Sequence, residues 1–145
     1  DLAIVFSGAV APEAIEAHAS LIDDAPDAGL LAVTSADRLH TDWRTTMRER
    51  AAGARGAISH AEMLLGSLSP DASLVTVIDA HPATLSWLGS VCGHAIAPLG
   101  VDHFGQSGSV AELYRSYGID TDALIDGVAE VRLRRFRENG SLAVN

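Results

Sequence analysis

Residues 74–99 read LVTVIDAHPATLSWLGSVCGHAIAPL, a stretch in which two apolar runs flank a helix-like segment. The runs are Leu74–Ile78 and Ala95–Leu99. Apolar runs of this length without polar alternation are typical of strands covered on both faces of a parallel sheet. Pro82 fits the first turn of a helix between them, and Gly93 fits its end. The stretch therefore predicts a strand, a crossover helix and a second, parallel strand.

The same alternation extends in both directions along the chain. Leu2–Phe6 and Leu30–Val33 are two more apolar runs of strand length, and Ala36–Arg50 is a plausible helix. Capping-box patterns that start at Ser59 and Ser109, each with a Glu three residues later, predict two further helix starts. Because strands that alternate with helices need crossover connections, we expect an α/β fold, a three-layer α/β/α sandwich with a mostly parallel sheet.

Helical spacing predicts which residues of the first and last helices face the sheet. The stripes are Ile15, Ala19 and Ile22 in a helix that Pro12 opens, and Ile125, Ala129, Leu133 and Phe136 in a helix that begins near Thr121 and stops at Gly140. Pro98 removes one hydrogen-bond donor from the last apolar run. That strand is therefore expected at or near an edge of the sheet.

Charge and composition exclude several classes of protein. The chain has 19 acidic and 10 basic residues, a net charge of −9, and every basic residue is Arg. Such a surface repels phosphate backbones and offers no basic aromatic platform, so no nucleic-acid partner is expected. No apolar run approaches the ~18 residues of a membrane helix. The lone Cys92 fits a reducing cytoplasm and predicts a buried, inert thiol.

The length of 145 residues suits one domain. The sequence does not begin with Met, which fits a segment of a longer chain, although a processed protein would begin in the same way. We therefore expect residues 1–145 to be a single domain cut from a longer, multidomain chain.

Polar residues gather at the carboxyl ends of the predicted strands. They are Ser7, Gly8, Thr34, Ser35, Asp79, His81, Asp102 and His103. Ligands of open parallel sheets bind at this edge, where helix N-termini favour a small anion. Caps and turns use the same residue types, and we favour that interpretation over a ligand site.

No complete catalytic or cofactor motif is present. Ser7–Pro12 lacks the second and third Gly of G-x-G-x-x-G, and a chain without Lys has no Walker motif. Gly105–Ser109 falls short of G-x-S-x-G. The residues that could form a metal cluster match no standard ligand spacing: Asp79, His81, His94 and His103. We therefore predict no catalytic, cofactor-binding or metal-binding residue in this chain.

Two features have both a structural and an interface interpretation. The arginines near the end of the last helix suit its dipole, or an acidic surface of another domain or subunit: Arg132, Arg134, Arg135 and Arg137. Trp43 and Trp87 are core residues by default and interface anchors if exposed.

A longer pattern begins at Ser73. It runs through the strand–helix–strand stretch into residues 100–108, GVDHFGQSG, and on to Glu112-Leu113-Tyr114. This order resembles the C-terminal domain of the transketolase family, in which a strand ends in a Gly and a Phe-Gly-x-Ser loop before a helix with a Glu-Leu-Tyr-like segment. Residues 1–8 and 29–35 look like the first two strands of that domain.

The pattern Gly100-x-Asp102-x-Phe104-Gly105 is most similar to the homodimeric pyruvate dehydrogenase branch, the decarboxylating component of a 2-oxo acid dehydrogenase complex. His103, Gln106 and Gly108 depart from that branch. Dehydrogenase and transketolase activities therefore both stay open.

The resemblance implies a sheet of about five strands, usually with one antiparallel, in a domain that packs against upstream domains of the same chain and supports a homodimer. It implies that the full-length enzyme uses thiamine diphosphate and Mg²⁺, held between two preceding domains, to decarboxylate a 2-oxo acid or transfer a two-carbon unit. This domain alone would be inactive. The residues expected to shape the strand-end crevice or an interface are Gly8, Asp79, His81, Asp102, His103 and Phe104.

An alternative is a stand-alone or regulatory α/β module that binds a small anion in the strand-end crevice. It predicts saturable anion binding to this chain, weakened when His81 or His103 is replaced by Ala.

Overall fold

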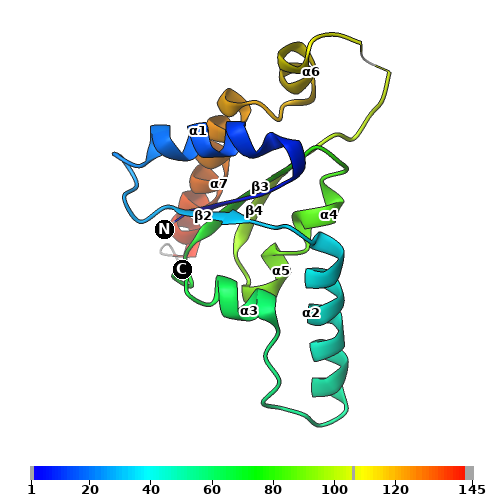
Figure 1. Ribbon diagram of the computed structural model, residues 1–145. Helices are drawn as coiled ribbons and strands as arrows, with labels where there is room; N and C mark the ends of the chain where they lie inside the picture. Colours follow the sequence, from blue (N-terminus) through cyan, green and yellow to red (C-terminus); the bar gives the residue numbers. More distant parts are fainter. Residues whose placement is uncertain (1, 106, 143–145) are drawn as a thin grey trace.

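The computed structural model describes residues 2–105 and 107–142. Its sheet has four strands in the order β2-β1-β3-β4, and every neighbouring pair is parallel. The strands are β1 (Leu2–Ser7), β2 (Gly29–Ala32), β3 (Ser73–Ile78) and β4 (Ala95–Leu99). Helices cover both faces of the sheet (Figure 1), which confirms the predicted three-layer α/β/α class.

The sheet differs from expectation in its number of strands. Residues 2–105 and 107–142 contain four strands rather than about five, and none of them is antiparallel. The residues described after β4 form a loop and two helices, α6 (Val110–Tyr117) and α7 (Thr121–Leu142). β4 pairs with β3 alone, so Pro98 lies in an edge strand as predicted.

The helices divide between the two faces. One face carries α1 (Ala11–Leu21) and α7, which contact each other, and the other carries α2 (Ala36–Ala51), α3 (His60–Leu65), α4 (Ala83–Ser86) and α5 (Gly89–Cys92). A single 3₁₀ turn, η1 (Gly8–Val10), joins β1 to α1. No helix of the described residues is both long enough and apolar enough to span a bilayer.

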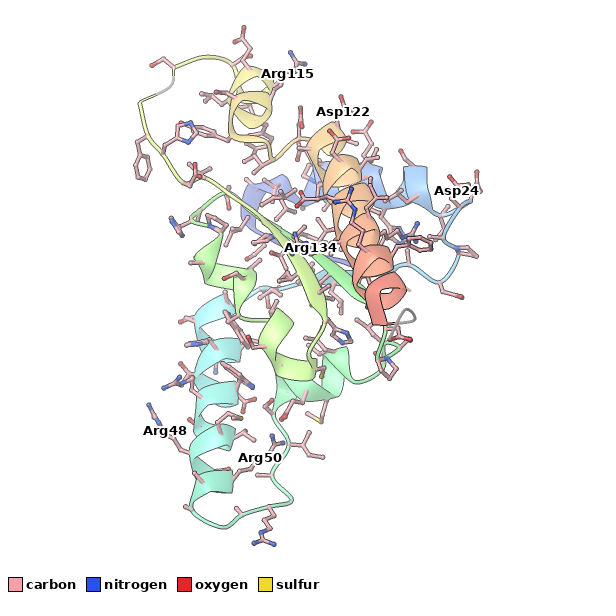
Figure 2. All side chains as sticks on the ribbon, turned by 180° about the vertical axis from the view of Figure 1, so that it is seen from behind. Asp24, Arg48, Arg50, Arg115, Asp122 and Arg134 are labelled. Atoms are coloured by element: carbon pink, nitrogen blue, oxygen red, sulfur yellow. The ribbon has the colours of Figure 1, made fainter. Side chains whose placement is uncertain are left out.

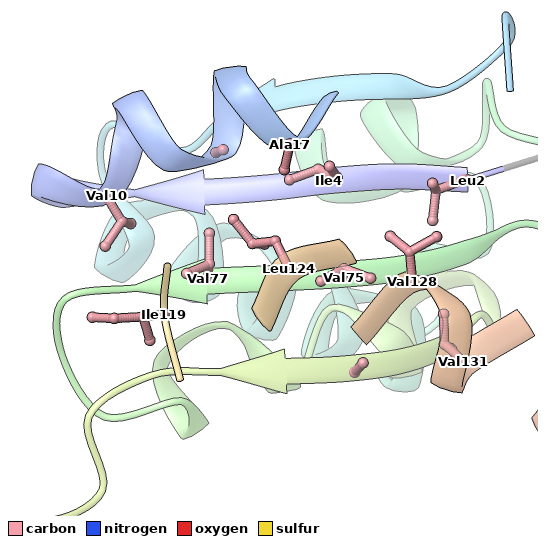
Figure 3. Packing of buried hydrophobic residues seen from close by; sticks show 12 residues of the cluster. Leu2, Ile4, Val10, Ala17, Val75, Val77, Ile119, Leu124, Val128 and Val131 are labelled. Carbon is pink, nitrogen blue, oxygen red and sulfur yellow. The ribbon is translucent and has the colours of Figure 1, made fainter. Parts of the chain in front are cut away.

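Alternate residues of the strands fill two separate cores. Leu2 and Ile4 of β1 point toward α1 and α7 (Figure 3), whereas Ala3 and Val5 pack with Leu65 of α3 on the other face. Since both sides are buried, the strand has no polar face to expose. This explains the unbroken apolar runs of the sequence.

The predicted stripe of α7 is wrong by about one residue. Leu124, Val128 and Val131 are buried, whereas Leu133 and Phe136 are 58% and 79% exposed. Gly127 lies on the buried face of α7, where a Cβ would make ordinary van der Waals contact with Val75 Cγ1 at 3.4 Å and Leu99 Cδ1 at 3.6 Å. The helix also continues past Gly140 to Leu142 instead of stopping there.

The stripe predicted for α1 is also wrong. Ala14 and Ala17 are fully buried, and Ile15 is 53% exposed. Small side chains on the buried face let the helix axis approach the sheet. Pro12 lies in the first turn, as predicted.

The segment between Pro82 and Gly93 forms two short helices, α4 and α5, instead of one. Leu88 and Val91 donate their backbone N–H groups to carbonyls three residues earlier, at 3.1 and 3.2 Å, which tightens the chain into 3₁₀-like turns. Gly93 ends α5 with φ +79°, as predicted for a C-terminal glycine.

Candidate functional site

The carboxyl ends of β1 and β3 meet at the centre of the sheet. β1 connects onward to β2 on one side, and β3 to β4 on the other, so this is the point where the strand order reverses. Ligands of open α/β sheets usually bind at such a point. Gly8 follows β1 and Asp79 follows β3. The predicted crevice therefore lies where the topology favours a site.

The protein's own carboxylate fills this position. Asp79 Oδ2 accepts a hydrogen bond of 3.2 Å from the backbone N–H of Ala9, in the turn that leads into α1. Gly8 has φ +85°, and a Cβ on it would lie only 1.8 Å from Asp79 Oδ1. The backbone N–H that an anion would use at the head of this turn is thus already occupied.

The loops that follow β3 and β4 are joined. Val101 donates its N–H to the carbonyl of Ala80 at 2.9 Å. Gly100 permits this contact, since a Cβ there would lie 2.6 Å from the same carbonyl oxygen and 2.8 Å from Pro82 N. This close approach is a structural reason for the Gly that ends the fourth predicted strand.

His81 and His103 serve local structure. His81 Nδ1 accepts a 3.2 Å bond from the N–H of Ala83 at the start of α4, which is the capping interpretation. His103 Nδ1 lies 2.6 Å from Asp102 Oδ1, and its ring packs edge-on against Tyr117 at 5.0 Å. The hydrogen bond from His103 lowers the pKa of Asp102, with a smaller contribution from the charge of His81.

The remaining predicted positions do not complete a site. Phe104 is 93% exposed. The six predicted crevice residues thus provide two carboxylates and two imidazoles, and a diphosphate would meet negative charge there. In the part of the chain that the structure describes, no three His, Cys, Asp or Glu residues gather as metal ligands. The residues of this crevice therefore do not fit thiamine diphosphate with Mg²⁺.

A cavity of about 420 Å³ lies beside β2, away from the predicted crevice residues. Its lining comes from the end of β2 and the following loop, the first turns of α2, and α3: Ala32, Val33, Thr34, Ser35, Arg38, Leu39, Asp42, His60 and Leu64. Sequence reasoning noted Thr34 and Ser35 but missed Arg38 and His60. Arg38 could have been found from the sequence, because it lies in the first turn of a predicted helix that follows a predicted strand.

Arg50 of α2 and Glu62 of α3 form a bidentate ion pair. Arg50 Nη1 and Nη2 lie 2.6 and 2.9 Å from the two carboxylate oxygens of Glu62, and the N–H and hydroxyl of Ser59 each donate to Glu62 Oε2 at 2.8 Å. The hydrogen bond from Arg50 is the main cause that lowers the pKa of Glu62 to about 2. Figure 2 shows Arg50 on the side of α2 that faces the loop before α3.

The two tryptophans join α2 to α4. The rings of Trp43 and Trp87 stack at 5.1 Å, and His40 packs edge-on against Trp87 at 4.9 Å. Both tryptophans are half-buried. They lie at the contact between α2 and the end of α4 and are not fully buried core residues.

Two of the arginines of α7 bind groups of this chain. Arg135 donates to the carbonyl of Ala72 at 3.0 Å and to Asp71 Oδ1 at 2.6 Å, and Arg134 pairs with Glu130 at 3.0 Å. The contacts of Arg135 tie α7 to the start of β3, whereas the Arg134–Glu130 pair lies within α7. They explain part of the basic cluster without an external partner.

The sequence prediction for Cys92 is wrong on burial. The residue is exposed. Partial desolvation of the thiol, together with the negative charge of Glu62, raises its pKa. The thiolate is therefore disfavoured, which agrees with an unreactive cysteine.

These features define a class of protein: an α/β/α domain with a parallel sheet, whose central strand-end position holds an internal carboxylate. Comparison with known proteins identifies a solved structure with a similar fold. No protein-family model and no curated protein sequence matches the chain. A solved chain described as a split-gene transketolase, an inactive β4 tetramer, superposes on it with a TM-score of 0.64 and 18% sequence identity. The chain therefore has a transketolase-like fold.

The superposition covers a much larger share of this chain than of the transketolase chain. It includes 90% of this chain and 39% of the transketolase chain. The sequence printed here thus corresponds to less than half the length of that protein.

Proposed function

We propose that residues 1–145 form the C-terminal domain of a thiamine diphosphate-dependent enzyme of the transketolase or 2-oxo acid dehydrogenase type. The observation that carries this proposal is the likeness of nearly the whole fold to part of a transketolase chain. The Gly100-x-Asp102-x-Phe104-Gly105 pattern supports it independently and favours the pyruvate dehydrogenase branch.

In this proposal the domain is structural. Thiamine diphosphate supplies the nucleophile and electron sink of such enzymes when it is bound. The crevice of this chain carries Asp79 and Asp102 where a diphosphate would need donors, so the cofactor and its Mg²⁺ belong to upstream domains of the same chain. The domain packs against them and supports a homodimer.

The surface of the domain offers groups for such packing. Leu133 and Phe136 are exposed on α7, and Phe104 is exposed on the loop after β4. Exposed apolar residues of this kind suit a contact with another domain. The transketolase neighbour is itself oligomeric, as its description as a tetramer states. The single thiol of the chain agrees with a cytoplasmic enzyme.

Calorimetry with thiamine diphosphate and Mg²⁺ tests this division of roles. We expect no heat of binding with this chain and saturable binding with the full-length protein. Tight cofactor binding by residues 1–145 alone would contradict the proposed domain assignment.

A further inference from the structure

We propose that the cavity beside β2 binds a small aliphatic carboxylate. Its volume of about 420 Å³ lies within the range of small-molecule sites. None of the six residues predicted to shape the crevice or an interface lines it, whereas Thr34 and Ser35, which follow β2, do. The proposal concerns a second position on the sheet edge, and it stands whether or not the proposed function is correct.

Two basic side chains from different elements line the polar part of the cavity. Arg38 comes from α2 and His60 from the start of α3. None of the four ion pairs among the described residues includes Arg38. A guanidinium group presents paired N–H donors whose geometry matches a carboxylate. Arg38 can therefore receive an external anion without giving up an internal partner.

The one acidic side chain of the lining is already engaged. Asp42 Oδ2 accepts a 2.7 Å hydrogen bond from the backbone N–H of His60. This bond ties α2 to α3 across the cavity and offsets part of the negative charge. In this respect the cavity differs from the Gly8–Asp79 position, where the internal carboxylate uses the available backbone donor.

The other part of the cavity is apolar. Val33, Leu39 and Leu64 line it and also line an inner recess of about 30 Å³ that reaches Leu65 and Leu88 of the core. A recess of this volume admits a group about as large as one water molecule or a methyl group, and no ring. The ligand that fits both parts is a carboxylate with a short aliphatic chain.

The test uses sodium butyrate as the probe and ¹H–¹⁵N NMR of this chain, with ionic strength held constant by sodium chloride. We expect saturable shifts of the amides of Arg38, Leu39 and His60. Arg38→Gln should raise the dissociation constant about tenfold or more, because a charge-assisted hydrogen bond is lost. Arg48→Gln removes the same charge from the exposed last turn of α2 (Figure 2) and should leave binding unchanged.

One further variant and two further ligands test whether binding needs both the carboxylate and the aliphatic chain. Leu64→Ala should weaken butyrate by about threefold to tenfold and leave inorganic phosphate unaffected, since phosphate has no aliphatic chain to bury. Butylammonium should not shift the same amides. The proposal is overturned if butyrate shows no saturable shifts, if Arg38→Gln and Arg48→Gln bind it equally, or if phosphate or butylammonium binds as tightly as butyrate.

Discussion

Gly8 and Asp79 lie 71 positions apart in sequence and in contact in space. Gly8 combines a positive φ of +85° with a space that the carboxylate of Asp79 already fills. The sequence could suggest that both residues follow strands. It could not show that a glycine is required so that the carboxylate can reach the N–H of Ala9, because that contact depends on which strands are neighbours.

Replacing Gly8 tests this contact. Gly8→Ala should lower the free energy of unfolding by roughly 2–4 kcal/mol, since it adds backbone strain and a clash. Gly53→Ala serves as the control, because Gly53 has φ +108° and open space around it, and should cost about 1 kcal/mol. Urea unfolding measures both.

A double variant separates strain from clash. Asp79→Ala removes the atoms that the new Cβ would meet, so the Gly8→Ala, Asp79→Ala pair should lose less stability than the sum of the single variants. Strict additivity would show that the two residues do not interact.

Glu62 illustrates how much of a polar site local sequence can reveal. Its capping box with Ser59 is predictable because the two residues are three positions apart, and the structure confirms it. Arg50, which binds both oxygens of the carboxylate, is 12 positions away on another helix. That partner follows from the packing of α2 against α3, which no local pattern encodes.

The Arg50–Glu62 pair predicts a pH dependence. The pKa of Glu62 is lowered from 4.5 to about 2, so its stabilising contribution is complete above pH 4.5 and is lost as the pH falls toward 2. Glu62→Gln keeps the capping geometry but removes the charge, and should cost about 1–2 kcal/mol at pH 7 and much less near pH 2. Urea titrations at several pH values measure this difference.

Glu49→Gln provides the matched control on the exposed surface of α2. Its cost should stay within about 0.5 kcal/mol. An equal pH dependence of the two variants would contradict the role assigned to Glu62.

At the scale of elements, helix and strand positions follow from local patterns, but helix faces do not. Continuous apolar runs identified all four strands of the described residues, and Pro98 identified an edge strand. In α7 two apolar series run one residue apart, and spacing alone cannot choose between them. In the structure α7 packs on β3 and β4 through the series that contains Leu124, Val128 and Val131.

Alanine substitutions in α7 test the observed face. Leu124→Ala should lower the free energy of unfolding by about 2–4 kcal/mol, because it leaves a cavity in the core. Leu133→Ala should change it by less than about 1 kcal/mol, since that side chain is 58% exposed. Thermal or urea unfolding compares the two variants. A larger loss of stability for Leu133→Ala than for Leu124→Ala would support the buried face predicted from spacing.

At the scale of the whole molecule, the polar groups of the strand ends serve the fold. Asp79 closes the head of the β1–α1 turn, His81 caps α4, and Gly100 joins two loops. The sequence allowed both a cap and a ligand at these positions. At Asp79, His81 and Gly100 the structure shows caps and turns. It places Thr34 and Ser35, which follow β2, in the lining of a separate cavity.

The mass of the native polypeptide tests the central claim most directly. An immunoblot of source cells with an antibody against this domain should show a band several times heavier than 15.1 kDa, because the proposed enzyme needs other domains to hold its cofactor. A band near 15.1 kDa would contradict the claim that this chain is one domain of a longer enzyme.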